Sequence, residues 1–517
     1  MHPTPLTVPA LLTRAVRDFG EHTYLVTPTD RLSYRDAERR SALVARWLLA
    51  RGVGKGTRVG LFFANGPEWV IWWLAVSRIG ALAVPLSTMY RPAEIAKVAR
   101  LADIGLLAAP PTVLDIDVPE RLEEAFGELA GQPAGQLAMR AAPFLRSVVL
   151  TGQTPAGWAT RYHDDAPELV PAGLLEAAEA EVTAADLAIM VHTSGSTADP
   201  KGVIHTHGTL VRQTSTWPAA IRAISKSPEP PVILSAMPFF WIGGVLAVTG
   251  ALHEPVTLLV MAKLEAGTAL DLVEAEHATG IVGWPAFTQR IRAHPSFAER
   301  DLSSAPMLRD GPLDIAMTDV PDGFPVHRTM SETAGGFAYT DLAVVDDAGA
   351  AVPDGVVGEL LVRGVGVMAG YNKKERAETF DSDGWYHTGD RVYRRSGDPR
   401  LFYVGRSTEL IKTSGANVSP LEVEAVIEGF DDIAQCVVVG VEHPERGEEV
   451  CAVLVAAGAG HVDVESVARR AREALSSYKV PTRWITASGA QIPTLPSGKL
   501  NRKALRDWVV DSVLPGQ

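Results

Sequence analysis

Cysteine and long uninterrupted apolar runs are scarce in this chain of 517 residues. Its two cysteines, Cys436 and Cys451, lie in apolar strand-like runs, so buried thiols in a reducing compartment are expected rather than a disulfide scaffold. The longest apolar run, residues 69–86, is interrupted by Ser77 and Arg78 and therefore predicts a buried helix leading into a strand. The N-terminus shows no basic segment followed by a sustained apolar one. These absences predict a cytoplasmic protein with no signal peptide and no membrane span.

Positive charge is also in deficit. The 48 lysines and arginines face 61 aspartates and glutamates, a formal net charge of −13, which argues against a protein that coats nucleic acid. The exception is residues 464–506, where nine basic residues accompany only two acidic ones. This segment indicates either a local anion site or a solvated basic helix face.

The hydrophobic pattern predicts an α/β fold. Apolar β-branched runs alternate with helical periods, which is typical of parallel sheet with crossover helices. The alternation covers residues 58–110 and returns at residues 231–285. From residue 342 to 364, short strands with Asp-Gly turns predict an antiparallel sheet or small barrel. A separate α+β pattern follows, so a linker near Thr408 is expected to divide an N-terminal domain, residues 1–407, from a mobile C-terminal lid, residues 408–517.

The stretch "HTSGSTADPKG" follows a short apolar strand and combines hydroxyls, glycines and one lysine. Backbone N–H groups and hydroxyls in such a loop cradle phosphate oxygens, with Lys201 as a mobile cation. The pattern differs from the Walker motif, because the lysine follows a proline; a flexible linker is the alternative. The phosphate-contacting candidates are Thr193, Ser194, Gly195, Ser196, Thr197 and Lys201.

Four segments together resemble the adenylate-forming superfamily, which includes acyl-CoA synthetases. The first is the loop just described, and the second is "GWYHTGD", whose Asp390 would hold the ribose hydroxyls of AMP. The third, residues 403–427, resembles the domain junction, with Arg406 near the ribose. The fourth, residues 493–505, resembles the terminal segment whose lysine, here Lys499, contacts the carboxylate and the α-phosphate.

The resemblance implies further site residues and ATP, CoA and Mg²⁺ as cofactors. Glu332 would be the Mg²⁺-linked glutamate and, with Lys499, a catalytic residue. Gly415 would line the channel for the CoA thiol after the lid rotates, and Trp241 would gate that channel and the acyl pocket. The remaining nucleotide candidates are Asp310, Gly311, Arg328, Thr329, Met330 and Ser331, and the remaining pocket candidates are Trp284, Gly335 and Gly336.

The chain departs from the family pattern around the nucleotide. Arg328 and Thr329 stand where the family has an aromatic residue and a glycine, Asp310 lies near the expected base, and Trp241 replaces a frequent histidine. Arg328 either stacks on adenine or displaces it, and β-branched Thr329 restricts the backbone.

The predicted function is therefore an AMP-forming acyl-CoA synthetase acting on a carboxylic acid. One alternative is a variant that only converts a preformed acyl-AMP, supplied by a separate adenylating enzyme, and CoA to acyl-CoA. The others are an acyl-AMP ligase that loads a carrier protein and a catalytically silent sensor of nucleotide or acyl ligand. The basic residues of 464–506 are candidate partners of the CoA phosphates, and a homodimer is an open expectation. Three histidines, His192, His205 and His207, are interpreted as packing or substrate-near groups rather than a zinc site.

Overall fold

The computed structural model describes residues 5–153, 156–163, 170–193, 199–225, 229–283, 285–310, 329–330, 339–406, 410–458, 461–493 and 500–511. The chain divides into two compact units. The first comprises Met1–Thr88, Ala96–His192 and Gly202–Gly405, and the second comprises Met89–Ile95, Thr193–Lys201 and Arg406–Gln517. The predicted boundary at Thr408 falls among residues 407–409, outside the described residues, and stays a prediction.

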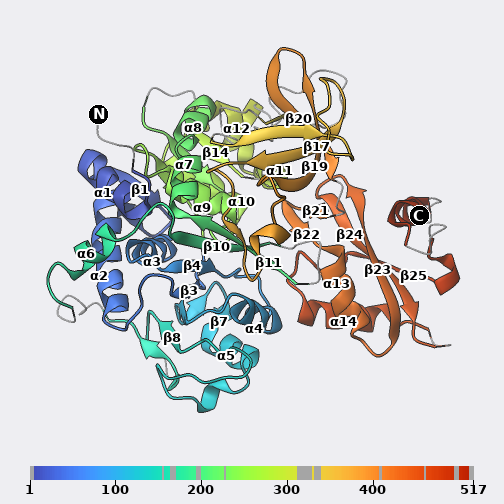
Figure 1. Ribbon diagram of the computed structural model, residues 1–517, viewed down its shortest axis with the longest axis horizontal. Coiled ribbons are helices and arrows are strands. Elements are labelled where there is room, and N and C mark those ends of the chain that lie inside the picture. Colours follow the sequence, from blue (N-terminus) through green and yellow to red (C-terminus); the bar gives the residue numbers. More distant parts are fainter. Residues whose placement is uncertain are drawn as a thin grey trace. The chain divides into compact units, whose positions relative to one another are not determined.

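The largest sheet of the first unit has eight strands in the order β18-β11-β10-β4-β3-β5-β8-β9. The pairs β3–β4, β3–β5, β5–β8, β8–β9 and β4–β10 are parallel, whereas β11 and β18 are antiparallel. Figure 1 shows β3, β4 and β10 side by side in the blue to green part of the chain. The strands are β3 (Arg58–Leu61), β4 (Leu82–Pro85), β5 (Leu106–Ala109), β8 (Ser147–Leu150), β9 (Thr160–Arg161), β10 (Leu187–Thr193), β11 (Lys201–Thr206) and β18 (Gly370–Tyr371).

A second, five-stranded sheet has the order β14-β12-β13-β1-β2. Its members are parallel except for β2, which pairs antiparallel with β1. The crossovers from β12 to β14 confirm the predicted parallel sheet in residues 231–285, apart from Trp284, which lies outside the described residues. The strands are β1 (Thr23–Val26), β2 (Arg31–Ser33), β12 (Val232–Ser235), β13 (Thr257–Leu259) and β14 (Gly280–Val282).

Helices follow the parallel strands, as the alternating pattern predicts. Helix α3 is apolar on all sides and completely buried from Trp69 to Arg78, and it leads directly into β4, which confirms the interpretation of the longest apolar run. The helices before residue 320 are α1 (Val8–Phe19), α2 (Tyr34–Leu49), α3 (Pro67–Arg78), α4 (Pro92–Leu101), α5 (Val118–Ala125), α6 (Leu174–Ala180), α7 (His207–Thr214), α8 (Trp217–Ser225), α9 (Ile242–Gly250), α10 (Ala266–Ala275), α11 (Pro285–Arg292) and α12 (Pro306–Asp310). A small hairpin, β6 (Thr112–Val113) with β7 (Ile116–Asp117), precedes α5.

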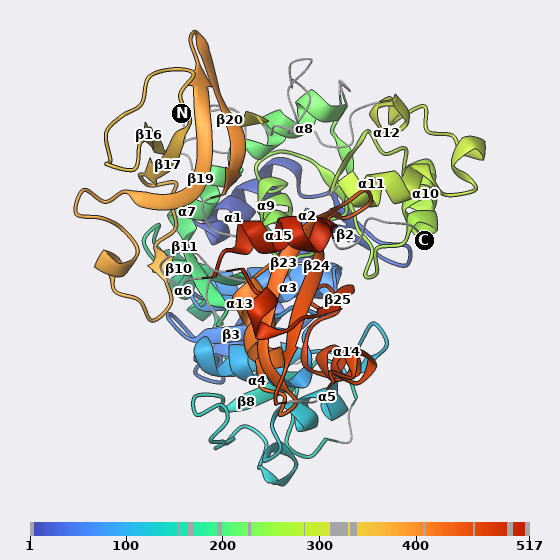
Figure 2. The same cartoon turned by 90° about the vertical axis from the view of Figure 1, so that its right-hand side faces the viewer.

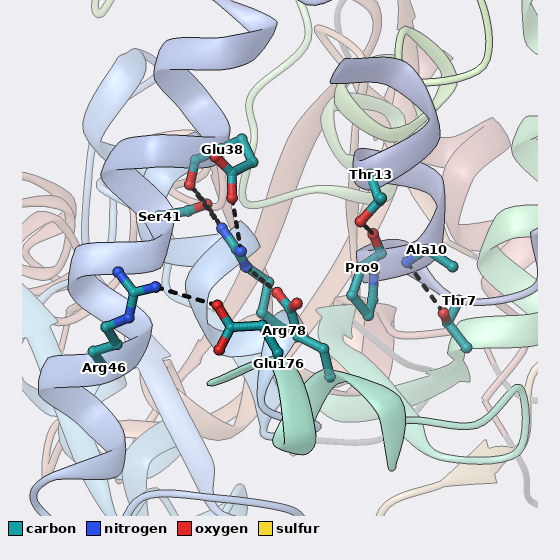
Figure 3. A network of polar contacts seen from close by, with 10 residues as sticks. Thr7, Pro9, Ala10, Thr13, Glu38, Ser41, Arg46, Arg78 and Glu176 are labelled. Atoms are coloured by element: carbon teal, nitrogen blue, oxygen red, sulfur yellow. Dashed lines mark hydrogen bonds and ion pairs between the residues drawn. The ribbon is translucent and has the colours of Figure 1, made fainter. Parts of the chain in front are cut away.

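A buried arginine joins three of these helices. The Arg78 guanidinium, at the end of α3, donates to the Glu38 carbonyl at 2.7 Å and to Ser41 Oγ at 3.0 Å, both on α2. It also pairs with the carboxylates of Glu38 and of Glu179 on α6. Figure 3 shows this network next to the more exposed pair of Arg46 and Glu176, which also links α2 to α6. Helix α6 precedes β10, the strand that ends at the predicted phosphate loop.

A third sheet in the described chain has the order β15-β20-β19-β17-β16 and confirms the predicted antiparallel region. Strands β16 and β17 pair from Asp341 opposite Arg363 to Val345 opposite Glu359. The strands are β15 (Thr329–Met330), β16 (Asp341–Val345), β17 (Gly358–Arg363), β19 (Tyr386–Arg395) and β20 (Asp398–Arg406).

The second unit is a small α+β fold with strand order β22-β21-β24-β23, and β25 pairs parallel with β24. Figure 2 shows α13, α14 and α15 around β23 and β24. Cys436 on β23 and Cys451 on β24 are buried free thiols, as predicted, and burial raises the pKa of Cys451 to about 12. The elements are β21 (Ile411–Thr413), β22 (Ala416–Val418), α13 (Pro420–Glu428), β23 (Ile433–His443), β24 (Gly447–Ala456), α14 (Val464–Ala474), β25 (Arg483–Thr486) and α15 (Arg502–Asp511).

Candidate functional site

The predicted phosphate loop is framed by two neighbouring strands. Strand β10 is buried from Ala188 to His192 and becomes exposed at Thr193, and β11 begins at Lys201. Gly202 is required by packing: a Cβ there would lie 2.7 Å from Met190 Sδ and 3.2 Å from Asn372 Cβ. The four central candidates, Ser194, Gly195, Ser196 and Thr197, lie outside the described residues.

A β-bulge positions Asp390. The β17–β19 register shifts between Glu359 and Leu361, and Gly389 adopts a φ of +71° on the facing strand. Thr388 Oγ1 donates to the Leu360 carbonyl at 2.6 Å and accepts from the Asp390 N–H at 3.0 Å. Bulges bend a strand and re-aim the next side chain. Asp390, which is partly buried, is therefore held by its own strand rather than by a loop.

The same bulge is closed by a carboxylate. Glu359 Oε1 accepts from the Gly389 N–H at 3.0 Å, and Glu359 Oε2 lies 3.3 Å from His387 Nδ1. The other ring nitrogen of His387 lies 3.4 Å from Asp381 Oδ2. Neither Glu359 nor Thr388 was predicted; the Thr-Gly pair before Asp390 was the available signal.

Segments that are far apart in the sequence meet in this third sheet. Strand β20, which ends at Arg406, lies between two other strands of the site. On one side is β15, formed by Thr329 and Met330, and on the other is β19, which carries Asp390. Thr329 pairs with Phe402 in an antiparallel ladder. A strand accommodates a β-branched residue well, so the absence of the family's glycine at this position fits the local backbone.

The predicted gate loop is pinned by a residue that the sequence analysis missed. Asn65 Nδ2 donates to the Met237 carbonyl at 3.0 Å, and Asn65 Oδ1 accepts from the Phe239 N–H at 2.8 Å. Trp241, partly buried, follows directly as the N-cap of α9 and contacts the Phe240 ring at a centroid distance of 5.3 Å. The available signal was a single polar residue at the end of the apolar run "RVGLFFAN".

The glycines after Trp241 let α9 start close to this loop. A Cβ at Gly243 would lie 2.1 Å from Met237 Cε, and a Cβ at Gly244 would lie 2.3 Å from the Pro238 carbonyl oxygen. Gly244 is therefore a steric requirement of the gate loop, because its neighbour is backbone, whereas the flexible Met237 side chain could move away from a Cβ at Gly243.

Gly415 occupies a tight hairpin turn in the second unit. Ser414 and Gly415 have φ values of +50° and +86° between the paired residues Thr413 and Ala416. Positive φ at both central positions is the type I′ pattern. Gly415 is exposed, and the Ser414 N–H donates to the Arg446 carbonyl at 2.8 Å.

Several basic residues of the 464–506 segment are paired with carboxylates. Lys479 is buried, with its Nζ 2.8 Å from Glu422 Oε1. The other pairs are Arg470 with Asp432, Arg483 with Glu449 and Arg502 with Glu424. These four basic residues stabilise the fold through ion pairs. The predicted contact with CoA phosphates therefore falls to the other basic residues of the segment.

Of the histidines in the loop region, His192 and His207 are buried and His205 is partly buried. Burial lowers the pKa of His192, His205 and His207 to about 4 in each case. His207 Nδ1 accepts from the Val8 N–H at 3.3 Å. Within the described residues, no group of three or more His, Cys, Asp or Glu side chains is arranged to hold a metal ion.

The remaining predicted residues are described only in part or not at all. Asp310 ends α12, but its side chain and those of Thr329, Met330 and Arg406 are outside the description. The residues that lie wholly outside it are Trp284, Gly311, Arg328, Ser331, Glu332, Gly335, Gly336 and Lys499. Their roles stay predictions.

The fold and the motif positions define the class. Residues 12–313 match the family model of AMP-binding enzymes, and residues 422–499 match that of the AMP-binding enzyme C-terminal domain. The chain therefore belongs to the AMP-binding enzyme family. The predicted class, an AMP-forming acid–thiol ligase of the adenylate-forming superfamily, is confirmed.

Individual relatives are similar along almost their whole length. Feruloyl-CoA synthase of an Amycolatopsis species is 30% identical, covering 92% of this chain and 93% of its own. The 4-coumarate–CoA ligase CCL1 of Humulus lupulus is 27% identical, covering 93% and 89%. The solved amide bond synthetase McbA from Marinactinospora thermotolerans has a TM-score of 0.75 at 24% identity, covering 96% and 99%, which confirms the fold.

Among the described residues, no helix combines the length and apolar character needed to cross a bilayer.

Proposed function

We propose that this protein is an acyl-CoA ligase. It joins a carboxylic acid to the AMP part of ATP with release of pyrophosphate, and the thiol of CoA then displaces AMP to give a thioester. The proposal draws on the family match and on relatives named feruloyl-CoA synthase and 4-coumarate–CoA ligase.

The observation that carries the proposal is the bulge that holds Asp390. A carboxylate accepts hydrogen bonds from two neighbouring hydroxyls, which suits the ribose of a nucleotide. Thr388 and Glu359 fix the backbone that carries this carboxylate, and the strand that ends at Arg406 lies next to it in the sheet. A preorganised acceptor of this kind loses little entropy when the nucleotide binds.

Formation of the acyl-adenylate requires positive charges, which the lysines of the predicted phosphate loop and of the C-terminal lid would supply. A carboxylate and a triphosphate repel each other, so cations must bring them together and neutralise the developing charge. Lys201 and Lys499 are proposed for this role. Mg²⁺, if held by Glu332, would bridge the carboxylate and the phosphates, and ATP supplies the adenylyl group.

Aromatic acids are the first substrates to examine. Ferulate and 4-coumarate appear in the names of two relatives, and the gate candidate Trp241 is a partly buried aromatic ring at the end of the loop that Asn65 pins. Long-chain fatty acids form the contrasting panel, because another relative, from Bacillus subtilis, is named for them.

The second candidate is an enzyme that has lost the first half-reaction and uses preformed acyl-AMP. The departures Asp310, Arg328 and Thr329 favour it. The position of Thr329 in a regular strand favours an intact site instead.

A single-turnover experiment separates these functions. In one arm the full-length protein receives acid, Mg·ATP and CoA, and pyrophosphate and thioester are measured. In the other arm it receives synthetic acyl-adenylate and CoA without ATP. Thioester in both arms is the expected result.

The other outcomes each identify an alternative. Thioester from the acyl-adenylate alone would establish the separated half-reaction. Pyrophosphate without thioester would replace CoA by another acceptor, such as a carrier protein. Binding of AMP without either product would overturn the proposal in favour of a sensor.

A further inference from the structure

His192 has an unusual environment for a buried polar side chain. The residue is only 6% exposed. Neither Nδ1 nor Nε2 has a hydrogen-bond partner among the residues that the structure describes. A buried polar group without a partner costs free energy that a folded protein rarely leaves uncompensated.

Other buried polar atoms without partners lie in different settings. The indole N–H groups of Trp47, Trp69, Trp72 and Trp73 belong to the apolar core formed with α2 and α3. His207 lacks a partner only at Nε2, since its Nδ1 accepts from the Val8 N–H. His192 lacks both, and it lies at the end of a strand rather than inside the core.

The strand register places His192 at the edge of the sheet where ligands bind. Ile189 on β10 pairs with Ala83 on β4, so three residues further along both parallel strands His192 comes level with Leu86. This is the carboxyl end of both strands, and ligands of open α/β sheets bind outside that end. The next residue, Thr193, is exposed and opens the predicted phosphate loop.

The sheet face that carries His192 is defined by its neighbours. Side chains alternate along a strand, so His192 shares a face with Met190. Met190 lies on the face toward which a Cβ at Gly202 on β11 would point, 2.7 Å from its Sδ. The ring therefore lies on the same face of β10 as Met190, directly before the loop.

The chemistry of the ring limits its role. Burial keeps the imidazole neutral by lowering its pKa to about 4. A neutral imidazole offers one N–H donor and one acceptor. It is a poor base for a thiol with a pKa of about 8.5, but it is a good donor to a phosphate or carbonyl oxygen.

We propose that His192 donates a hydrogen bond to the acyl-phosphate group of the bound acyl-adenylate. The ligand would then supply a hydrogen-bond partner that the described residues do not. This inference rests on the proposed function, because it assumes that an acyl-adenylate binds at the neighbouring loop.

Calorimetric binding to the full-length protein tests the inference. The probes are AMP and an acyl-sulfamoyl adenosine carrying the acid that gives the fastest thioester formation. His192→Phe keeps a ring but removes both nitrogens, and His192→Gln keeps an N–H donor. We expect His192→Phe to weaken binding of the acyl-sulfamoyl adenosine at least tenfold and His192→Gln to remain within about threefold of the native protein.

Two readouts separate ligand contact from packing. The thermal midpoint of ligand-free His192→Phe should equal or exceed that of the native protein, because the variant removes an unpaired buried group. The ring ¹⁵N resonances of His192, assigned by their loss in that variant, should shift when the ligand binds. Met190→Leu, on the same face of β10, is the matched control and should leave the affinity unchanged.

The outcomes distinguish this inference from the proposed function. If the native protein forms thioester but His192→Phe binds the acyl-sulfamoyl adenosine as tightly, the inference alone fails. If the Phe and Gln variants lose affinity equally and both have lowered thermal midpoints, His192 has a packing role, and the inference is also overturned. If the native protein neither binds the probe nor makes thioester, both proposals fail.

Discussion

At the scale of single residues, Thr388 is the most informative position near the proposed nucleotide site. Its hydroxyl both donates to the Leu360 carbonyl and accepts from the Asp390 N–H. Thr388→Val is nearly isosteric but loses both bonds, which leaves two backbone groups unpaired. We expect a stability loss of about 1–2 kcal/mol and AMP affinity reduced roughly three- to tenfold, because Asp390 loses its fixed position.

Thr388→Ser is the matched control, because it retains the hydroxyl and should restore most of the affinity. AMP titration calorimetry and urea unfolding measure the two effects separately. Unchanged AMP affinity in Thr388→Val, despite a measurable loss of stability, would remove Asp390 and its bulge from the nucleotide site.

At the scale of secondary-structure elements, the Arg78 network determines how α2, α3 and α6 pack. Removing one partner of a buried ion pair leaves the others uncompensated, at a cost of about 3–5 kcal/mol. We therefore expect Arg78→Met to lower the free energy of unfolding by that amount. Burial raises the pKa of Glu179, so this carboxyl is already poorly solvated. Adding Glu179→Gln to Arg78→Met should recover part of the loss.

Arg46→Met provides the control for this prediction. Arg46 pairs with Glu176 between α2 and α6, but their side chains are 30% and 62% exposed. An exposed pair contributes about 0–1 kcal/mol, so this variant should unfold close to the native protein. Urea denaturation followed by tryptophan fluorescence reports both variants. Similar effects of the Arg78 and Arg46 substitutions would show that the buried network adds no more than a surface pair.

Elements were predictable from the sequence where a whole segment is apolar and bounded by polar residues or turns. Helix α3 and the middle of strands β23 and β24 are apolar in sequence and buried in the structure. The bulge at Gly389 was not predictable, because it depends on Glu359, thirty residues away in the sequence. Asn65 was missed for the same reason, since its partners Met237 and Phe239 lie on a distant segment.

At the scale of the whole molecule, the sequence motifs identified the family because the residues of each motif are close together in the sequence. Asp390 and Gly415 could be proposed as site residues from their neighbours in the sequence, and their roles stay predictions. The bulge and the hairpin turn explain the glycines at 389 and 415, which both have positive φ. The acid substrate could not be assigned, because an acyl pocket is shaped by side chains from many segments. The sequence likewise could not predict that His192 lacks a hydrogen-bond partner among the described residues, because that depends on which side chains lie near it in three dimensions.

Buried histidines give the first unit a specific dependence on pH. Burial lowers the pKa of His192, His205, His207 and His253 to about 4, against about 6.5 in the unfolded chain. Between these two pKa values the unfolded state binds more protons than the folded state. The free energy of unfolding therefore falls as the pH drops from about 6.5 toward 4, and these groups do not affect it above about 6.5. Each histidine contributes at most about 1.4 kcal/mol per pH unit inside the window.

His253→Gln isolates one of these groups. His253 Nε2 lies 3.0 Å from Thr214 Oγ1, a contact that a glutamine amide can keep without titrating. Urea unfolding of the native protein should show a marked loss of stability from pH 7 to pH 5. The variant should lose less over the same range, by up to about 1.4 kcal/mol per pH unit. Identical pH dependence in the two proteins would mean that His253 is protonated equally in the folded and unfolded states. A native protein equally stable at pH 7 and pH 5 would contradict the prediction for all four histidines, because their burial would then impose no barrier to protonation.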